Sequence, residues 1–378
     1  MSFIVFSDDW GVHPSSCQHI FKVLSRSHRV LWVNTLGMRL PRLSFEDARK
    51  VLQKASSMLR TRGGRRHSLE HGSGPAVCSP LMTPFRKPRW IADWNVRSVL
   101  KSVRRAASRH GVENPLVVTT VPNVHDVLER MDSGKVVYYC VDDFSEWPGL
   151  DKSAILGMEK RLLEHVDEVI CTSQALYERF HGELPTALLT HGVEIDLFSR
   201  SSRETHRILE GIPEPRVGYY GLFDARADWD LLVTLAGSLP DVSFVITGPT
   251  EGDVSALRRT RNIHFTGPVD YAELPLVVNG WKACLLPYRL NELTRKINPL
   301  KLKEYLATGK PVIASPLPEA VSLLPHLRIA GSATEWTACL REALSGAWQP
   351  DRQAVLEFLE PHSWERKAEQ FLRICEAA

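Results

Sequence analysis

Short apolar runs, each followed by a polar or glycine-rich turn and then by residues with helical spacing, recur along most of the chain. The first such unit has an apolar run at 3–6, a helical pattern from 15 to about 27 and a second apolar run at 29–34. Short apolar runs bounded by turns are typical of buried strands, and their alternation with helices is typical of parallel sheets. The pattern therefore predicts an α/β protein assembled from strand–helix units.

The predicted strands form two series, one in each half of the chain. The first series continues with strands at 116–120, 135–141, 168–173 and 186–190 and with helices near 123–131 and 151–166. The second has strands at 216–221, 242–248, 263–267, 283–288 and 311–315, with helices at 229–239, 271–279, 333–345 and 363–375. A polar segment at 199–204 separates the series and is typical of a linker. We expect two Rossmann-like, doubly wound domains at 1–197 and 198–360, followed by a C-terminal helical segment at 361–378.

The composition is typical of a soluble globular protein, since 43% of the 378 residues are hydrophobic and 24% are charged. The seven cysteines are scattered and never spaced Cys-x-x-Cys, which indicates a reducing compartment and argues against a disulfide framework. The chain starts in an apolar strand without a basic leader, and no run reaches the roughly 18–20 apolar residues of a transmembrane helix. We expect a cytoplasmic protein, peripheral at the inner face of the plasma membrane.

Positive charge is concentrated in residues 39–109. This region holds 17 Lys and Arg residues against four Asp and Glu, an excess of 13, so the rest of a chain with a net charge of +3 carries −10. Helical patterns at 45–60 and 90–109 carry much of this charge, and Trp90 and Trp94 share one face of the second. Such helices suit an anionic membrane surface. Nucleic acid is an alternative partner that no recognition motif supports, and a solvated basic face is the third interpretation.

The stretch at 298–311 predicts a short helix that leads directly into a buried strand. Pro299 suits the first turn, and Gly309 ends the helix. Lys301 lies in the first turn, where the helix dipole disfavours a cation, so we expect an anion nearby. Glu304 follows on the same face, and a carboxylate can accept hydrogen bonds from both hydroxyls of a ribose. The pair would suit a sugar nucleotide, and an exposed ion pair on an amphipathic helix is the alternative.

Motifs in the second half resemble, in the family's order, the nucleotide-binding half of GT-B fold glycosyltransferases that use nucleotide sugars. They are Gly218-x-x-Gly221, Phe265-x-Gly267-x-Val269, Leu286-Pro-Tyr288, the run from Pro299 to Val312, and Ser363-Trp-Glu365. His191-Gly-Val-Glu194 resembles the interdomain motif of the family. The segments 9–16 and 139–145 are similar to bacterial polysaccharide and cell-wall enzymes of the teichuronic-acid or exopolysaccharide type. The resemblance implies two Rossmann-like domains facing a central cleft, with a C-terminal helix that returns towards the first.

The resemblance also implies roles for individual residues. Glu304 would bind the ribose hydroxyls, Lys301 the diphosphate or a carboxylate of the donor sugar, and the backbone of Val269 the nucleobase edge. Gly221 would let its loop approach the phosphates, and a simple turn glycine is the alternative. The other donor-side residues are Arg226, Arg295, Lys296 and Leu300. The implied donor is a nucleoside diphosphate sugar, expected to be UDP-linked, and the implied mechanism uses no metal or cofactor.

Two positions depart from the pattern of the retaining members of the family. Many of them have a second glutamate eight positions before the ribose glutamate, where this chain has Lys296. Many also have an Arg and a Lys in the loop after the first strand of this domain, where the loop 222–228 has only the cation Arg226. Arg289, Arg295 or Lys296 would supply the missing charge. The sequence therefore leaves open whether the anomeric configuration is retained or inverted.

An inverting mechanism needs a base that deprotonates the acceptor hydroxyl, and carboxylates that follow strands of the first domain are candidates. Asp142 is the preferred base, Asp143 the second and Asp9 the third. Capping of a helix or turn is the alternative role for Asp142 and Asp143. The expected acceptor or cleft residues are Trp10, His13, His191 and Gly192.

Two further motifs argue against other kinds of site. Asp228-Trp-Asp230 has the spacing of the metal site in the other glycosyltransferase fold, but it begins a predicted helix and is interpreted as an N-cap. The segment 218–221 lacks the middle glycine of a GxGxxG fingerprint, which argues against an NAD enzyme.

These features favour a glycosyltransferase that moves a sugar from a nucleoside diphosphate sugar to a lipid-linked glycan acceptor in polysaccharide or cell-surface glycan synthesis. Two alternatives remain, a nucleotide-sugar 2-epimerase of the same fold and a non-catalytic scaffold of glycan synthesis. The donor sugar, nucleobase, acceptor, linkage and oligomeric state have no signature in the sequence.

Overall fold

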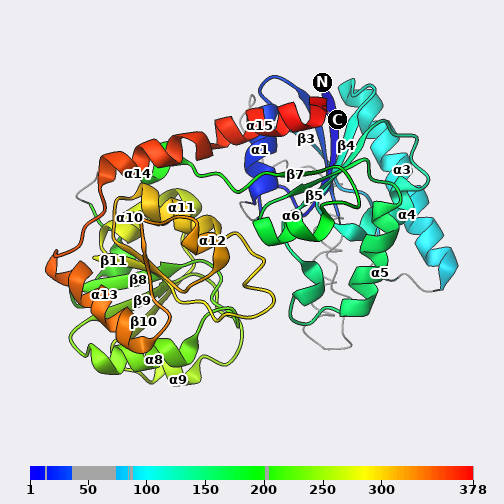
Figure 1. Ribbon diagram of the computed structural model, residues 1–378. Coiled ribbons are helices and arrows are strands. Elements are labelled where there is room, and N and C mark those ends of the chain that lie inside the picture. Colours follow the sequence, from blue (N-terminus) through cyan, green and yellow to red (C-terminus); the bar gives the residue numbers. More distant parts are fainter. Residues whose placement is uncertain (13–14, 36–73, 84, 86–87, 201–203, 378) are drawn as a thin grey trace. The chain divides into compact units, whose positions relative to one another are not determined.

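The computed structural model describes all residues except 13–14, 36–73, 84, 86–87, 201–203 and 378 (Figure 1). The chain divides into two units, Met1–Leu189 with Ala368–Ala378, and Thr190–Lys367. The chain enters the second unit after Leu189, ahead of the predicted boundary at 197, and it returns to the first unit within its last helix. The helix predicted at 45–60 lies outside the described residues.

The first unit contains a parallel sheet with helices on both faces (Figure 1). The strand order is β3-β2-β1-β4-β5-β6-β7, and the strands are β1 (Ser2–Ser7), β2 (Arg29–Asn34), β3 (Ala76–Cys78), β4 (Leu116–Thr119), β5 (Val136–Cys140), β6 (Glu168–Cys171) and β7 (Thr186–Leu188). Because β1 lies between β2 and β4, the strand order reverses there. Loops that follow strands at such a switch point are where open α/β sheets bind ligands.

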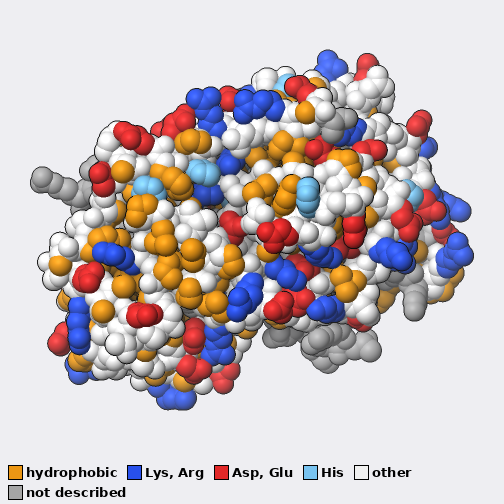
Figure 2. Space-filling view, viewed as in Figure 1, with side chains coloured by type: hydrophobic (Ala, Val, Ile, Leu, Met, Phe, Trp, Pro, Cys, Tyr) orange, Lys and Arg blue, Asp and Glu red, His pale blue; other side chains and the backbone are white. Residues whose placement is uncertain are grey.

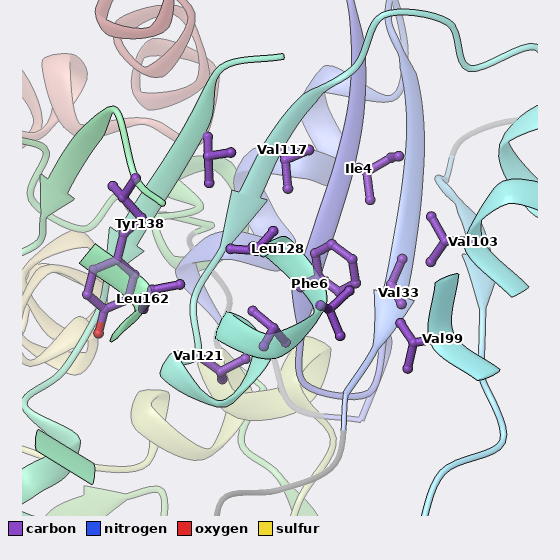
Figure 3. Packing of buried hydrophobic residues seen from close by; sticks show 14 of the residues in the cluster. Ile4, Phe6, Val33, Val99, Val103, Val117, Val121, Leu128, Tyr138 and Leu162 are labelled. Atoms are coloured by element: carbon purple, nitrogen blue, oxygen red, sulfur yellow. The ribbon is translucent and has the colours of Figure 1, made fainter. Parts of the chain in front are cut away.

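The helices of the first unit cover the sheet with apolar side chains. They are α1 (Ser16–Leu24), α3 (Arg89–His110), α4 (His125–Leu128), α5 (Lys152–Leu163) and α6 (Gln174–Phe180). On one face, Val99 of α3 lies near Val33 and Phe6 of the sheet (Figure 3). On the other face, the ring centroids of Phe21 in α1 and Phe371 in α15 (Trp364–Ala377) are 5.4 Å apart. Strands buried on both faces read as continuous apolar runs, as the sequence shows.

The second unit has the same layered organisation around a second parallel sheet. Its strand order is β10-β9-β8-β11-β12-β13, with β8 (Arg216–Tyr220), β9 (Ser243–Thr247), β10 (Ile263–Gly267), β11 (Ala283–Leu286), β12 (Val312–Ala314) and β13 (Arg328–Ile329). The helices include α7 (Ile195–Phe198), α8 (Trp229–Ser238), α9 (Ser255–Arg258), α10 (Leu274–Asn279), α11 (Leu300–Ala307), α12 (Pro318–Val321), α13 (Ala333–Ser345) and α14 (Arg352–Leu359). The switch point here lies between β8 and β11.

Most elements lie where the hydrophobic pattern predicts them, and β2, β10 and α13 agree to the residue. The helix predicted at 123–131 was wrong in extent, because Pro122 starts a 3-10 turn (Pro122–Val124) and α4 that follows has four residues. The prediction also missed β3, α6 and α14, which have three, seven and eight residues. Elements of that length carry too few turns or alternations to give a clear period.

Two further sequence predictions concern membrane spans and cysteines. Within the described part of the chain, no helix is both long enough and apolar enough to cross a membrane. All seven cysteines are free thiols, and six of them are buried.

Candidate functional site

Three glycines lie at the carboxyl ends of the first three strands of the second unit. Gly221, Gly248 and Gly267 have φ angles of 112°, 133° and 80°. The amide of Gly221 donates to the carbonyl of Thr247 at 2.8 Å, and the amide of Gly248 donates to the carbonyl of Gly267 at 2.8 Å. A Cβ on Gly248 would lie 2.3 Å from the Gly221 carbonyl oxygen. Glycine is therefore required for these loops to approach one another so closely.

Lys301 passes directly beneath the first of these loops. It is the second residue of α11, and its Cε lies 2.3 Å from the position that a Cβ of Gly221 would occupy. Its Nζ lies 3.3 Å from the hydroxyl of Tyr288 and 5.2 Å from the ring centroid of Tyr219. The missing side chain of Gly221 thus leaves room for the lysine, whose ammonium group is placed at the switch point. Gly221 has a packing role as well as an unusual backbone conformation.

Arg226 provides a second cation beside the same tyrosine. Its guanidinium pairs with Asp224 at 2.8 Å and lies 5.9 Å from the ring centroid of Tyr288. Burial alone would raise the pKa of Tyr288. The nearby cations Lys301 and Arg226 outweigh this effect, so the pKa lies below its usual range. The two cations place positive charge at the carboxyl ends of β8 and β11. Such a charge suits a diphosphate.

Glu304 lies one turn further along α11 and is only 6% exposed. Its two carboxylate oxygens accept hydrogen bonds from the hydroxyls of Tyr220, at 2.6 Å, and Tyr271, at 2.8 Å. Burial raises the pKa of Glu304, while the two hydroxyls and Lys301 partly oppose the shift and the charge of Glu194 adds to it. The carboxylate is therefore held by neutral hydroxyl donors, the same chemical groups that a ribose presents.

The segment that contains the predicted interdomain motif, residues 191–194, contacts both α11 and α15. Lys303 Nζ donates to the carbonyl of His191 at 2.6 Å, and Lys367 Nζ lies 3.2 Å from Thr190 Oγ1. A Cβ on Gly192 would lie 2.6 Å from the ring of Trp364. His191 and Gly192 are thus buried in packing contacts within the second unit, and their role in acceptor binding stays a prediction.

The remaining predicted donor residues lie on two neighbouring segments. Leu300 is the first residue of α11, and Val269 is half-buried two residues after the end of β10. Arg295 is exposed and Lys296 is half-buried in the turn before α11, where their amides donate to Asn291 and Leu293. The described contacts bring Gly221, Arg226 and Lys301 together around Tyr288, with Glu304 adjacent on the same helix.

In the first unit, Asp143 is buried in an ionic network behind the carboxyl end of β5. It caps a 3-10 turn (Phe144–Glu146) by accepting from the amide and the hydroxyl of Ser145, at 3.1 and 2.6 Å. Arg179 Nη1 lies 3.3 Å from Asp143, and Arg179 Nη2 also bonds to Glu159. The carboxylate is thus neutralised by a fixed cation. This arrangement matches the capping role that the sequence left open.

Asp142 and Asp9 lie at the same edge of the first sheet, after β5 and β1. Asp142 is half-buried, as is Asp9, whose carbonyl accepts from Gln18 Nε2 at 3.2 Å. The ring centroids of Trp10 and Trp32 are 4.8 Å apart in an edge-to-face contact. Because all strands of the sheet are parallel, these residues share its carboxyl edge. His13 lies outside the described residues.

The comparison with known families concerns most of the second unit. Residues 214–345 match the family described as glycosyl transferases group 1. We refer to these matched residues as the group 1 domain. A Bacillus subtilis protein named as a teichuronic acid biosynthesis glycosyltransferase, TuaH, is 32% identical over 177 residues, which are 44% of this chain and 45% of that protein. The chain thus spans less than half the length of this curated relative.

Solved structures of the same architecture extend the comparison to the whole chain. Sucrose-phosphate synthase from Thermosynechococcus elongatus has a TM-score of 0.70 at 18% identity, with 99% of this chain and 98% of that chain covered. Anabaena Alr3699/HepE in complex with UDP-glucose has a TM-score of 0.69 at 14% identity, with both chains fully covered. These neighbours and the two parallel sheets confirm the predicted GT-B fold, and the group 1 domain confirms the predicted resemblance to glycosyltransferases.

The hydrogen bonds of the structure show how Asp228-Trp-Asp230 is used locally. The side chain of Asp228 accepts from the amide of Leu231 at 3.1 Å and caps α8, as predicted. Asp230 pairs with Arg289 at 2.6 Å. Among the described residues, no group of three or more His, Cys, Asp or Glu side chains could hold a metal ion.

Sequence reasoning missed several residues of the group 1 domain that the structure places next to Glu304 and Lys301. Tyr219 and Tyr220 end β8, and Tyr271 begins a 3-10 turn (Tyr271–Glu273) after β10. The available signal was their position near the carboxyl ends of strands, with Tyr219 and Tyr220 between two motif glycines and Tyr271 shortly after a third. Their contacts with α11 depend on the tertiary fold, which no local spacing encodes.

Proposed function

We propose that the protein transfers a sugar from a nucleoside diphosphate sugar, with a UDP-linked donor as the first choice, to a glycan acceptor in cell-surface polysaccharide synthesis. The observation that carries the proposal is the pairing of a buried carboxylate, Glu304, with the cation Lys301 on one helix at the glycine-lined edge of a group 1 domain. Support for the donor comes from the UDP-glucose bound by Anabaena HepE, and support for the pathway from the name of B. subtilis TuaH.

In the proposed reaction, the donor lies along the amino end of α11. Glu304 accepts from the ribose hydroxyls, and Lys301 and Arg226 stabilise the diphosphate as negative charge grows on it. Asp142 takes the proton of the acceptor hydroxyl while the hydroxyl oxygen bonds to the anomeric carbon. The bond from that carbon to the diphosphate breaks, and the diphosphate leaves with the electron pair. No metal or cofactor is needed, because protein cations neutralise the leaving group.

A thermal-shift screen of nucleotide sugars tests the donor, since a ligand that binds the folded state raises the unfolding midpoint. We expect UDP and one UDP-sugar to stabilise the wild-type protein and to lose this effect in Glu304→Ala. Stabilisation that is identical in wild type and Glu304→Ala would contradict the site. Incubation with the donor alone separates the two enzymatic alternatives, because an epimerised sugar formed without any acceptor would contradict transfer.

We further propose that the acceptor is lipid-linked and that α3 attaches the protein to the cytoplasmic face of an anionic membrane. Trp90 and Trp94 are 69% and 41% exposed at the amino end of α3, and Leu81 and Phe85 just before it are 55% and 56% exposed. Lys and Arg side chains recur along the part of Figure 2 where Figure 1 places α3. Exposed aromatic residues beside cations suit the boundary between lipid headgroups and acyl chains. Most of the basic region 39–109 lies outside the described residues.

Sedimentation with lipid vesicles tests this attachment. We expect binding to phosphatidylglycerol vesicles that weakens with added salt, and reduced binding for the double variant Trp90→Ser, Trp94→Ser. Val321→Ser, at a 45% exposed position of the second unit, is the matched control and should bind normally. Equal sedimentation of the wild type with anionic and neutral vesicles would contradict the proposal.

A further inference from the structure

The two tyrosines that hold Glu304 differ in burial and in packing. Tyr220 is 3% exposed, its ring packs edge-to-face against Tyr305 with centroids 4.8 Å apart, and its backbone amide donates a hydrogen bond to the Tyr305 hydroxyl at 2.9 Å. A ring fixed in this way is part of the core. Tyr271 lies on the short 3-10 turn after β10 and is only partly buried.

Tyr271 also links two parts of the proposed donor site. It is two residues beyond Val269, in the loop that follows Gly267, and its hydroxyl reaches across to α11 to bond Glu304 Oε1. Its ring packs edge-to-face against Phe198, with centroids 5.6 Å apart. The loop expected to meet the nucleobase is therefore tied to the carboxylate expected to bind the ribose.

Access to Glu304 is the next consideration. A carboxylate can accept up to about four hydrogen bonds, so two tyrosines do not exhaust its capacity. The side chain is nevertheless 6% exposed, and the protein surrounds most of the two oxygens. Ribose hydroxyls need the acceptor directions that face solvent. Because Tyr220 is packed in the core, Tyr271 is the side chain that can move aside and make an oxygen of Glu304 available to the ribose.

We propose that the Tyr271 hydroxyl occupies the place of a ribose hydroxyl on Glu304 in the unliganded protein and that the nucleotide displaces it. The inference rests on the proposed function, and it makes Tyr271 a residue that sets nucleotide affinity and selects for an intact ribose. Before the nucleotide sugar binds, Tyr271 supplies the hydrogen bond to Glu304 Oε1 while Tyr220 supplies the one to Oε2, which keeps the site preformed. When the nucleotide binds, a ribose hydroxyl replaces the Tyr271 hydroxyl as the hydrogen-bond donor to Glu304, and the loop 267–271 is released from α11.

Isothermal titration with UDP and with 2′,3′-dideoxyuridine 5′-diphosphate tests this exchange. In Tyr271→Phe the ring against Phe198 is kept and only the competing hydroxyl is lost. We expect UDP to bind about tenfold more tightly to this variant, the factor for one hydrogen bond to a charged group. The dideoxy ligand offers no hydroxyl to Glu304, so its affinity should be the same for the variant and the wild type.

Tyr220→Phe is the matched control, because it removes the other hydroxyl from the same carboxylate. This hydroxyl positions Glu304 rather than competing with the ligand, so UDP should bind more weakly. Tyr271→Leu, a second variant without the hydroxyl, should tighten UDP binding in the same direction as Tyr271→Phe.

Two results would overturn the inference, and they differ from failure of the proposed function. Weaker or unchanged UDP binding in both Tyr271 variants would mean that the hydroxyl acts together with the ribose or away from it. Equal tightening of UDP and the dideoxy ligand would mean that the ribose hydroxyls are not the competitors. If wild type binds none of UDP, GDP and ADP, the proposed function fails as well.

Discussion

The buried carboxylates Asp143 and Glu304 lie in comparable places, just beyond or beside the carboxyl ends of a parallel sheet, but different groups hold them. Asp143 faces the guanidinium of Arg179 at 3.3 Å and caps a turn. Glu304 faces two tyrosine hydroxyls at 2.6 and 2.8 Å, with the cation Lys301 nearby. A carboxylate held by a fixed cation is a structural part, since removing either partner leaves a buried charge. One held by neutral hydroxyls can exchange them for a ligand's hydroxyls.

This difference leads us to expect the catalytic base in the first unit and nucleotide binding in the second. In the first unit, Asp143 is paired with Arg179, so the half-buried Asp142 remains the carboxylate that we prefer as the base. In the second unit, the cations Lys301 and Arg226 lie around Tyr288, and Glu304, the proposed ribose ligand, lies on the same helix as Lys301. We therefore expect substitutions at Asp142 to change the rate, those at Asp143 and Arg179 to change stability, and those at Glu304 to change ligand affinity.

The largest expected effect belongs to Asp142. Replacing a general base typically lowers the rate by about 10²–10⁴-fold, so Asp142→Asn should lower kcat by this factor while the Kd for UDP is unchanged. Sugar transfer to an acceptor and titration with UDP provide the two measurements. Asp143→Asn is the comparison, and it should lower the unfolding midpoint more than it lowers kcat. Full turnover by Asp142→Asn would exclude it as the base.

The next effect concerns Arg179, which neutralises both Asp143 and Glu159. The two carboxylates are 3% and 5% exposed, so Arg179→Leu leaves two buried acids without their cation. The free energy of unfolding of the first unit should fall by about 3 kcal/mol. Urea unfolding measures the change, and Arg104→Leu, at an exposed position of α3, should behave like wild type. A loss no larger than that of Arg104→Leu would show that the network is not structural.

A smaller effect is a dependence of stability on pH in the second unit. Burial, followed by the charge of Lys367, lowers the pKa of Lys303 to about 7, and burial lowers the pKa of Lys367 to about 8. Unfolded lysines keep their protons up to a pKa of 10.5, so above pH 7 to 8 the unfolded state binds more protons than the folded state. Stability should therefore rise with pH between about 7 and 10, by on the order of 1 kcal/mol per pH unit for each lysine.

Thermal unfolding between pH 7 and pH 9 checks this dependence. Lys303→Met should be more stable than wild type at pH 7 and should show a shallower rise, because it removes one of the two titrations. Arg341→Met, at an exposed position of the same unit, should keep the full slope. A slope that Lys303→Met leaves unchanged would assign the pH dependence to other groups.

The sequence predicts the fold well because strands buried on both faces leave a signal in the chain itself. The runs at 29–34 and 263–267 became β2 and β10 without change. The pair Lys301 and Glu304 was also predicted from a local pattern, because residues three positions apart in a helix lie on the same face. Short elements such as β3 and α6 gave no comparable period.

The candidate site was predicted only as far as it depends on local spacing. Tyr271 meets Glu304 across 33 residues, and Arg179 meets Asp143 across 36 residues of chain. Such contacts arise from strand order, which places the loops after β8, β9 and β10 side by side. The sequence therefore identified the carboxylates but not the tyrosine and arginine side chains that hold them. It could not distinguish a structural acid from one available to a ligand.

The most direct test of the account is the affinity of UDP for Glu304→Gln, measured by isothermal titration beside wild type. The substitution keeps the size of the side chain and removes the negative charge of the carboxylate that we propose accepts hydrogen bonds from the ribose hydroxyls. We expect UDP to bind about tenfold or more weakly to the variant, the loss for a hydrogen bond to a charged group, whereas Glu210→Gln at an exposed position of the same unit binds as wild type does. Equal UDP affinity in wild type and Glu304→Gln would contradict the assignment of the donor site.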